Sequence, residues 1–114
     1  MNIKQNLILL VVSSALLLPL SVAAADGAAL YKEKACHTCH GEDADTPIMP
    51  AYPKLAGQNA EYLLAQMKDI KSGTRSNGQS VIMKGLVAAI SDEDLDAIAQ
   101  YVAGLGAKTE DVKK

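Results

Sequence analysis

The sequence predicts an all-α domain, and three observations lead to that prediction. No segment shows the sustained alternation of apolar and polar residues that is typical of a half-buried strand. Residues 60–72 and the segment that follows Ser91 instead repeat their apolar residues with the helical period. Both segments begin after a residue that can cap a helix and run up to a glycine. We therefore expect short helices joined by irregular loops.

Residues 1–25 are predicted to be a secretory signal peptide that is cleaved between Ala25 and Asp26. Residues 7–18 contain ten apolar residues in twelve, follow Lys4 and precede a run of three alanines. A basic start, a short apolar run and small residues at the cleavage site are typical of such peptides. An uncleaved membrane anchor is less favoured, because the apolar run is shorter than the roughly 20 residues of a bilayer span and a proline ends it. We expect export to the periplasm.

The next elements follow from local composition. Residues 26–35 are rich in Ala, Leu, Lys and Glu, which favours a first helix. Residues 42–57 contain three prolines and cannot form a regular helix. Asn59 can cap a helix over residues 60–72, and residues 73–80 have the composition of a loop that begins with a helix-ending glycine.

The last helix has the clearest local signals. Ser91 is predicted to be its N-cap, and the three acidic residues that follow place negative charge at the positive end of the helix dipole. Ile90 and Leu95 stand at the two positions of a hydrophobic staple. Either Gly104 or Gly106 is expected to end this helix.

Residues 26–114 are predicted to form a single domain. These 89 residues carry 10 basic and 13 acidic side chains, and the negative net charge disfavours nucleic acid as a partner. A chain of this size buries little surface, and four tyrosines are the only aromatic residues. Small exported domains of this kind are usually stabilised by disulfides, a metal or a large prosthetic group.

The two cysteines lie in the segment Cys36-His37-Thr38-Cys39-His40. The pattern C-x-x-C-H is the attachment signal of c-type haem. Two thioether bonds would hold one edge of the porphyrin, and a histidine directly after the second cysteine can bring its imidazole to the iron. Attachment outside the cytoplasm agrees with the predicted export. The sequence therefore predicts one covalent haem c, bound through Cys36 and Cys39, with His40 as the proximal iron ligand.

Three other interpretations of the two cysteines are less favoured. A disulfide between them would close a very small loop and add little stability. A thioredoxin-like redox pair would need neighbouring strands, and no strand-like run is visible in the sequence. A zinc site would need four ligands, usually in two separated pairs, whereas both histidines lie within the cysteine motif.

The iron needs a sixth ligand or keeps an open position. His37 cannot be that ligand, because it lies within the motif and stays on the proximal side, so a methionine is expected. Met83 is 43 residues from His40, which is enough chain to reach the distal face. Met67 lies on the apolar stripe of a helix, where core packing is the simpler role. Met49 lies nine residues after His40, in a segment that must first pass the haem. Met83 is the favoured ligand, and Met49 and Met67 remain alternatives.

The combined motifs resemble those of small class I c-type cytochromes. The resemblance is greatest to one half of the dihaem cytochrome c4 type and to the single-haem cytochromes c-553. The segments that carry it are residues 36–41 (CHTCHG), 52–58 (YPKLAGQ), 62–73 (YLLAQMKDIKSG), 81–85 (VIMKG), 91–94 (SDED) and 98–105 (IAQYVAGL). The dihaem proteins have two such halves, whereas this chain has one motif.

The resemblance implies the small class I cytochrome c fold, with short helices around one covalently bound haem. It also implies Cys36 and Cys39 as the attachment residues and His40 and Met83 as the axial ligands of the iron.

Two structural contacts are implied as well. A proline carbonyl after the motif would hold the second ring nitrogen of the proximal histidine, and Pro50 and Pro53 are both possible. Gly27 and Tyr31 of the first helix would pack against the last helix near Tyr101.

The predicted function is one-electron transfer by a soluble periplasmic carrier, not enzymatic catalysis. With both axial positions filled, no substrate can bind the iron, so electrons would pass through the exposed haem edge to and from transiently docked redox proteins. Membrane contact would arise only through partner complexes. One alternative is a haem subunit docked permanently on a periplasmic dehydrogenase or oxidase. A small peroxidase or gas binder is less favoured, because no further histidine is available as a distal acid or base.

Overall fold

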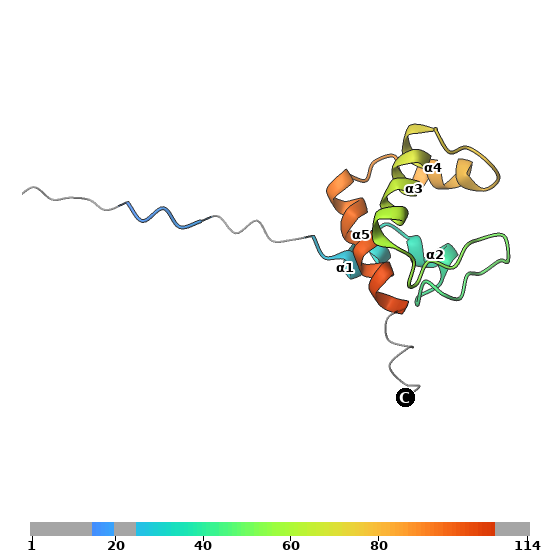
Figure 1. Cartoon of the computed structure of the whole chain (residues 1–114), viewed down its shortest axis with the longest axis horizontal. Coiled ribbons are helices and arrows are strands. Elements are labelled where there is room, and N and C mark those ends of the chain that lie inside the picture. The colour runs from blue at the N-terminus through green and yellow to red at the C-terminus, as the bar shows by residue number, and fades with distance from the viewer. Residues whose placement is uncertain (1–14, 20–24, 107–114) are drawn as a thin grey trace, which may run out of the picture.

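The computed structural model describes residues 15–19 and 25–106 of the chain (Figure 1). These residues form five helices, namely α1 (Gly27–Glu33), α2 (Cys36–His40), α3 (Ala60–Ser72), α4 (Ser80–Val87) and α5 (Asp92–Leu105). Within the described ranges there is no strand, and the all-α prediction is confirmed. The predicted signal peptide of residues 1–25 falls mostly outside these ranges, as do residues 107–114. The division into a signal peptide of residues 1–25 and a domain of residues 26–114 therefore stays a prediction.

Helix α5 is the centre of the packing. It contacts α1 on one side and α3 on the other, and α3 in turn contacts α4 (Figure 1). Helix α1 approaches α5 closely at Gly27, where a Cβ atom would lie only 2.7 Å from the Cβ of Tyr101. The rings of Tyr31 and Tyr101 pack with their centroids 5.8 Å apart. The expected contact between the first and last helices is therefore confirmed.

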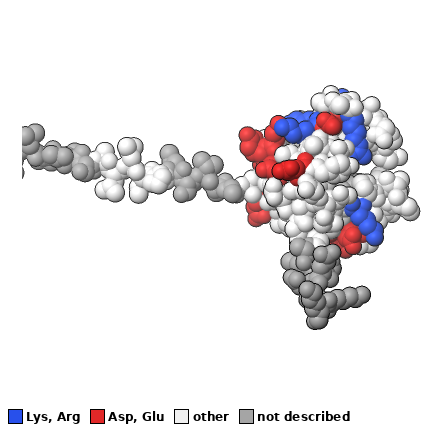
Figure 2. Space-filling model, viewed as in Figure 1, with Lys and Arg blue, Asp and Glu red and all other residues white. Residues whose placement is uncertain are grey.

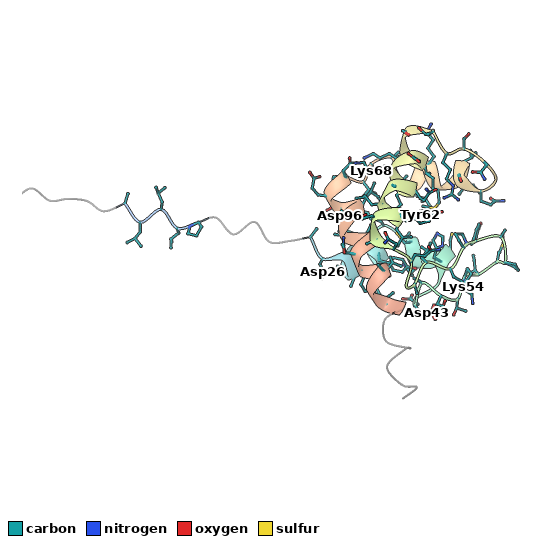
Figure 3. The ribbon with its side chains drawn as sticks, viewed as in Figure 1. Asp26, Asp43, Lys54, Tyr62, Lys68 and Asp96 are labelled. Carbon is teal, nitrogen blue, oxygen red and sulfur yellow. The ribbon has the colours of Figure 1, made fainter. Side chains whose placement is uncertain are left out.

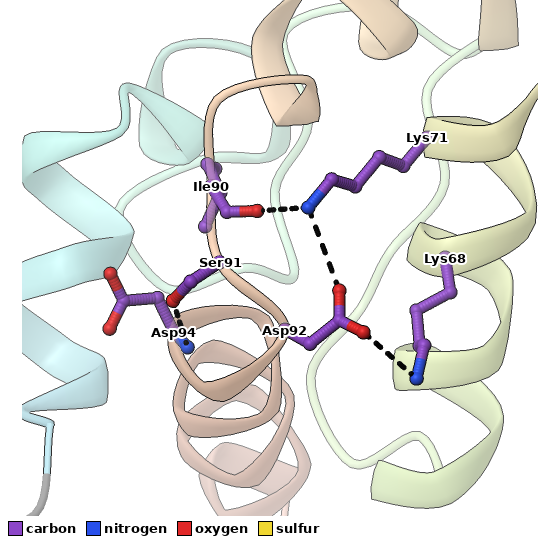
Figure 4. A network of polar contacts seen from close by, with 6 residues as sticks. All are labelled: Lys68, Lys71, Ile90, Ser91, Asp92 and Asp94. Carbon is purple, nitrogen blue, oxygen red and sulfur yellow. Dashed lines mark hydrogen bonds and ion pairs between the residues drawn. The ribbon is translucent and has the colours of Figure 1, made fainter.

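The two helices with capping signals have the predicted ends. The Asn59 side chain accepts a hydrogen bond from the Tyr62 N–H over 3.0 Å, and Gly73 ends α3 with a positive φ of 86°. The Ser91 hydroxyl accepts the Asp94 N–H over 3.2 Å at the start of α5 (Figure 4). Of the two glycines expected to end α5, it is Gly106 that follows its last residue.

Ile90 and Leu95 belong to one buried cluster, as the hydrophobic staple predicts. This cluster, called the Ile70 cluster below, also contains Ile70 and Val87. A second cluster, built around Tyr31, lies between α1, α3 and α5 and contains Ala44, Leu63, Ile98, Ala99 and Val102. Leu64 and Met67 of α3 contact both clusters, so α3 joins the two parts of the core.

Three helical features differ from the prediction. Helix α1 begins one residue later and ends two residues earlier than expected. The Asp26 carboxylate caps its start by accepting the N–H groups of Ala28 and Ala29. Helix α2, formed by the motif itself, was not anticipated. Helix α4, which contains Met83 and begins at Ser80 in the last position of the expected loop, was also missed. No side-chain cap marks its start at Gln79, so it is stabilised by packing against the Ile70 cluster instead.

A polar network fixes α3 to the start of α5 (Figure 4). The ammonium group of Lys71 donates a hydrogen bond to the carbonyl oxygen of Ile90. The carboxylate of Asp92 lies 3.1 Å from the Lys68 ammonium and 3.6 Å from that of Lys71. These contacts hold the turn between α4 and α5 against α3.

Charged residues are unevenly distributed on the face shown in Figure 2. Acidic side chains gather on the α5 side of this face, and basic side chains lie near α4 and, at Lys54, on the proline-rich segment (Figure 3). None of the helices among the described residues has the length and hydropathy needed to cross a membrane.

Candidate functional site

A cavity of about 370 Å³ lies between the helices. Helix α2 contributes Cys36, Cys39 and His40 to its lining, and α4 contributes Met83 with several aliphatic residues. Tyr62 of α3 also lines it, and in Figure 3 this residue lies above Lys54 of the proline-rich segment. Interiors of small domains are normally packed close to crystal density, so a space of this size beside the core indicates a site for a ligand.

Helix α2 places the two cysteines at this cavity. It begins after Ala35, which has a left-handed φ of 62°, and ends at Gly41, which has a φ of 90°. A Cβ atom at Gly41 would lie 2.9 Å from the carbonyl carbon of Thr46, so a glycine is required there. Cys36 and Cys39 are not joined in a disulfide, so both sulfur atoms are available for attachment, and burial raises the pKa of the Cys36 thiol.

His40 has only 6% of its surface exposed, and its ring orientation is fixed by one hydrogen bond. Its Nδ1 donates to the carbonyl oxygen of Pro53 over 2.9 Å. Because a carbonyl oxygen can only accept, the proton resides on Nδ1 and leaves the lone pair of Nε2 for a metal. Of the two prolines considered from the sequence, Pro53 makes this contact.

Backbone hydrogen bonds explain why Pro53 reaches the imidazole. The N–H groups of Leu55 and Ala56 both donate to the carbonyl oxygen of Ala44, over 2.7 and 3.0 Å. Ala44 is fully buried and has a positive φ of 56°. The turn at Ala44 thus folds the proline-rich segment back along α2.

The methionines considered as ligands occupy different surroundings. Met83 lines the cavity from α4. Met67 lines it from α3 and also packs against both buried clusters. Met49 is 41% exposed and is not part of the lining, and neither is His37. The structure thus brings Met83 and His40 to one cavity and leaves Met49 outside it.

These residues fit a covalently bound haem. Two free thiols, an imidazole with a free Nε2 and methionine sulfurs border a mainly aliphatic cavity, which is the donor set that c-type haem requires. Residues 24–106 match the family model described as cytochrome c. The chain belongs to the cytochrome c family. In this cytochrome, haem c is bound covalently through Cys36 and Cys39.

Similar proteins include cytochrome c4 of Pseudomonas aeruginosa, which is 48% identical over 74% of this chain and 40% of its own length. The thiosulfate dehydrogenase electron acceptor of Stutzerimonas stutzeri is 41% identical over 82% of this chain and 45% of its own. Cytochrome c-553 of Nitratidesulfovibrio vulgaris is 36% identical over 90% of this chain and 99% of its own. This cytochrome therefore spans less than half of the first two relatives and nearly all of the third.

Gln66 and Arg75 are among the polar residues of the cavity lining that the sequence interpretation missed. The Arg75 guanidinium donates from Nη1 to the Gln66 side-chain oxygen over 3.0 Å. Arg75 lies in the segment interpreted as a loop, and its side-chain partner is nine residues earlier on α3. No local pattern in the sequence indicates such a pair.

Proposed function

We propose that this cytochrome is a one-electron carrier with His40 and Met83 as the axial ligands of its haem iron. The observation that carries the proposal is that these two residues line one cavity from two separate helices, α2 and α4. When bound, haem supplies the one-electron couple between ferric and ferrous iron. Imidazole and thioether ligation favours the ferrous state and raises the reduction potential.

The surrounding chain supports electron transfer in two ways. The hydrogen bond from His40 to Pro53 holds the imidazole in one orientation and one tautomer. Aliphatic side chains from α3, α4 and α5 line the cavity and would limit the contact of water with a bound haem. A fixed ligand and limited contact with water keep the structural change between oxidation states small, which favours rapid transfer.

Weak docking of redox partners is supported by the surface beside the cavity. Ile82 of α4, a lining residue, is 57% exposed, and its neighbour Val81 is 64% exposed. Ile48 of the proline-rich segment is 65% exposed. Exposed aliphatic side chains of this kind suit the small, short-lived contacts that redox proteins make.

Export to the periplasm is part of the proposal. Leu16, Leu17 and Leu18 are 84%, 95% and 78% exposed, so these apolar residues add nothing to the folded core. A signal peptide over residues 1–25 accounts for them. We infer cleavage after Ala25, which leaves Asp26 free to cap α1.

A subunit role is the second candidate. The name of the Stutzerimonas relative, thiosulfate dehydrogenase electron acceptor, favours service to one dehydrogenase. Purification from the periplasm distinguishes the two roles, since a subunit would elute with a catalytic chain and a free carrier would elute alone.

Two measurements test the proposed function. Haem should remain with the polypeptide after acid–acetone extraction, because thioether bonds persist when axial bonds break. The Cys36→Ala variant should yield far less mature protein. A folded, colourless wild-type protein would refute the assignment as a haem carrier.

The Met83→Ala variant tests the distal ligand. The oxidised protein should lose the weak near-infrared charge-transfer band from sulfur to iron, and its reduction potential should fall. Met49→Ala is the matched control and should keep the band, since Met49 is outside the cavity. A Met83→Ala protein that retains the band would exclude Met83 as the ligand.

A further inference from the structure

We propose that the Ser80 hydroxyl donates a hydrogen bond to the sulfur of Met83 when that sulfur binds the haem iron. The inference rests on the proposed function, because it requires Met83 as the axial ligand. It adds Ser80 as a positioning residue that acts on the iron only through the methionine.

The burial of Ser80 is the first observation. Besides Tyr31, the buried polar residues of the described chain are His40 and Ser80, each with 6% of its surface exposed. All three line the cavity. The hydroxyl of Tyr31 is bonded to the Gly41 carbonyl, and the imidazole of His40 is bonded to the Pro53 carbonyl. Ser80 is therefore the buried polar residue of the lining whose side chain has no assigned role.

The lack of a partner for the Ser80 side chain is the second observation. The backbone N–H of Ser80 donates to the carbonyl oxygen of Asn77 over 3.1 Å, but its hydroxyl makes no hydrogen bond to the described residues. A serine in the first turn of a helix commonly bonds to nearby backbone groups, yet α4 begins without a side-chain cap. Buried hydroxyl groups are nearly always hydrogen-bonded, because burial without a partner costs free energy. We therefore expect an acceptor for this hydroxyl at the cavity.

The position of Ser80 on α4 identifies the acceptor. Ser80 is the first residue of this helix and Met83 is the fourth, so they share one face, and Val87 follows on the same face one turn later. All three line the cavity. Helical residues three positions apart have Cβ atoms about 5–6 Å from each other. Long side chains in a helix also extend toward its N-terminus, which directs the thioether of Met83 over the turn that begins at Ser80.

The two groups are chemically complementary. A thioether sulfur has two lone pairs, and the iron takes only one of them. The second lone pair can accept a hydrogen bond, and a serine hydroxyl has one proton to donate. Such a bond would hold the sulfur in one of its two configurations and would place the positive end of the O–H dipole close to the iron. Hydrogen bonds to a ligand orient it and change the reduction potential in this way.

The direction of the effect follows from the charge of the iron. Ferrous iron carries less positive charge than ferric iron, so the positive end of the hydroxyl dipole favours the ferrous state. Loss of the hydroxyl should therefore lower the reduction potential. It should also change the shifts of the ring-methyl resonances in the ferric protein, because these depend on the orientation of the sulfur lone pair. The near-infrared band from sulfur to iron should persist, since Met83 remains bound.

The experiment compares the holoproteins of the wild type, Ser80→Ala and Ser76→Ala at one pH. Ser76 is the matched control, because it lies on the same loop, is exposed and is not among the lining residues. Ser80→Ala should lower the reduction potential by less than Met83→Ala does, and it should change the ring-methyl shifts. Ser76→Ala should match the wild type in both measurements. A lower potential with wild-type ring-methyl shifts would overturn the inference, because the hydroxyl would then act on another group of the haem.

Threonine and valine at position 80 isolate the hydroxyl from the shape of the side chain. The two side chains have the same shape, but only threonine has a hydroxyl. Ser80→Thr should restore the wild-type potential and methyl shifts, whereas Ser80→Val should behave as Ser80→Ala. Equal values for the two variants would overturn the inference.

The Met83→Ala variant separates this inference from the proposed function. If Met83→Ala loses the near-infrared band while Ser80→Ala matches the wild type in potential and methyl shifts, only the role of Ser80 is refuted. If Met83→Ala retains the band, the proposed axial ligand is refuted, and the role of Ser80 with it.

Discussion

The hydroxyl of Tyr31 donates a hydrogen bond to the carbonyl oxygen of Gly41 over 2.7 Å. Tyr31 lies on α1 with 1% of its surface exposed, and Gly41 directly follows His40. The same tyrosine ring packs against Tyr101 of α5. One side chain thus connects the pair formed by α1 and α5 to the end of the haem-attachment helix.

Removing this hydroxyl should destabilise the protein. In Tyr31→Phe the Gly41 carbonyl loses its side-chain donor, which should lower the free energy of unfolding by about 1–3 kcal/mol. Denaturant unfolding of the holoprotein measures this change. Tyr101→Phe is the control, because no hydrogen bond of its hydroxyl is found among the described residues, and it should change stability by about 0.5 kcal/mol or less. Equal losses in both variants would contradict the role of the bond.

Tyr31 should also make the protein sensitive to alkaline pH. Burial, the main cause, raises the pKa of Tyr31 above its ordinary value. In the unfolded chain the phenol ionises at a pH of about 10, so its contribution to stability is complete below that pH and is lost as the pH rises further. Unfolding measured at pH 9 and pH 11 should show a smaller loss in Tyr31→Phe than in the wild type. A steeper loss in the variant would contradict this assignment.

Glycine to alanine changes at two helical positions should have opposite effects. At Gly27 the new methyl group would meet the Ala97 carbonyl and lie 2.7 Å from the Tyr101 Cβ, so α1 must move away from α5. Overpacking of this kind costs about 1–3 kcal/mol or more. At Gly104 the new methyl group would point into open space, with no atom beyond the adjoining helix backbone within 4 Å, and alanine should stabilise the helix by about 0.5–1 kcal/mol. Thermal unfolding measures both changes, and a stable Gly27→Ala protein would show that the close approach is unnecessary.

Asp92 should contribute to stability only above acidic pH. A hydrogen bond and the charge of Lys68 hold the pKa of Asp92 below its ordinary value. The contribution is therefore present above a pH of about 4, where the unfolded carboxyl ionises, and is lost as the pH falls further. The stability difference between wild type and Asp92→Asn should shrink between pH 6 and pH 3 in denaturant unfolding.

Asp94→Asn is the matched control for Asp92. Asp94 is in the same first turn of α5 and so contributes the same charge to the helix terminus, but it makes no ion pair with the described lysines. Its difference from the wild type should change less over this pH range. Equal changes in the two variants would assign the effect to the helix dipole and not to the contacts with Lys68 and Lys71.

The sequence predicted best where the signals are local. Asn59 and Gly73 mark both ends of α3, and Ser91 with the Ile90–Leu95 pair marks the start of α5. Helix α4 lacks a capping side chain and contains Gly85, so its sequence resembles an irregular apolar stretch. Its conformation depends on the Ile70 cluster, which forms only when α3 and α5 are in place.

At the candidate site, too, the sequence predicts local features but not contacts between distant residues. The C-x-x-C-H spacing is local and predicts the attachment residues directly. The choice of Pro53 over Pro50 depends on the two hydrogen bonds to the Ala44 carbonyl, which join residues eleven and twelve positions apart. The Arg75–Gln66 pair likewise requires the loop to return along α3. Contacts of this kind exist only in the folded chain.

The contact between α1 and α5 has a consequence for the order of assembly. It joins segments from the two ends of the domain, so it closes a long stretch of chain and carries the entropy cost and slow formation of distant contacts. In a chain exported N-terminus first, Cys36 and Cys39 emerge well before Ala97 and Tyr101. The cysteines can therefore receive the cofactor on an open polypeptide, and the arrival of α5 then closes the fold around it.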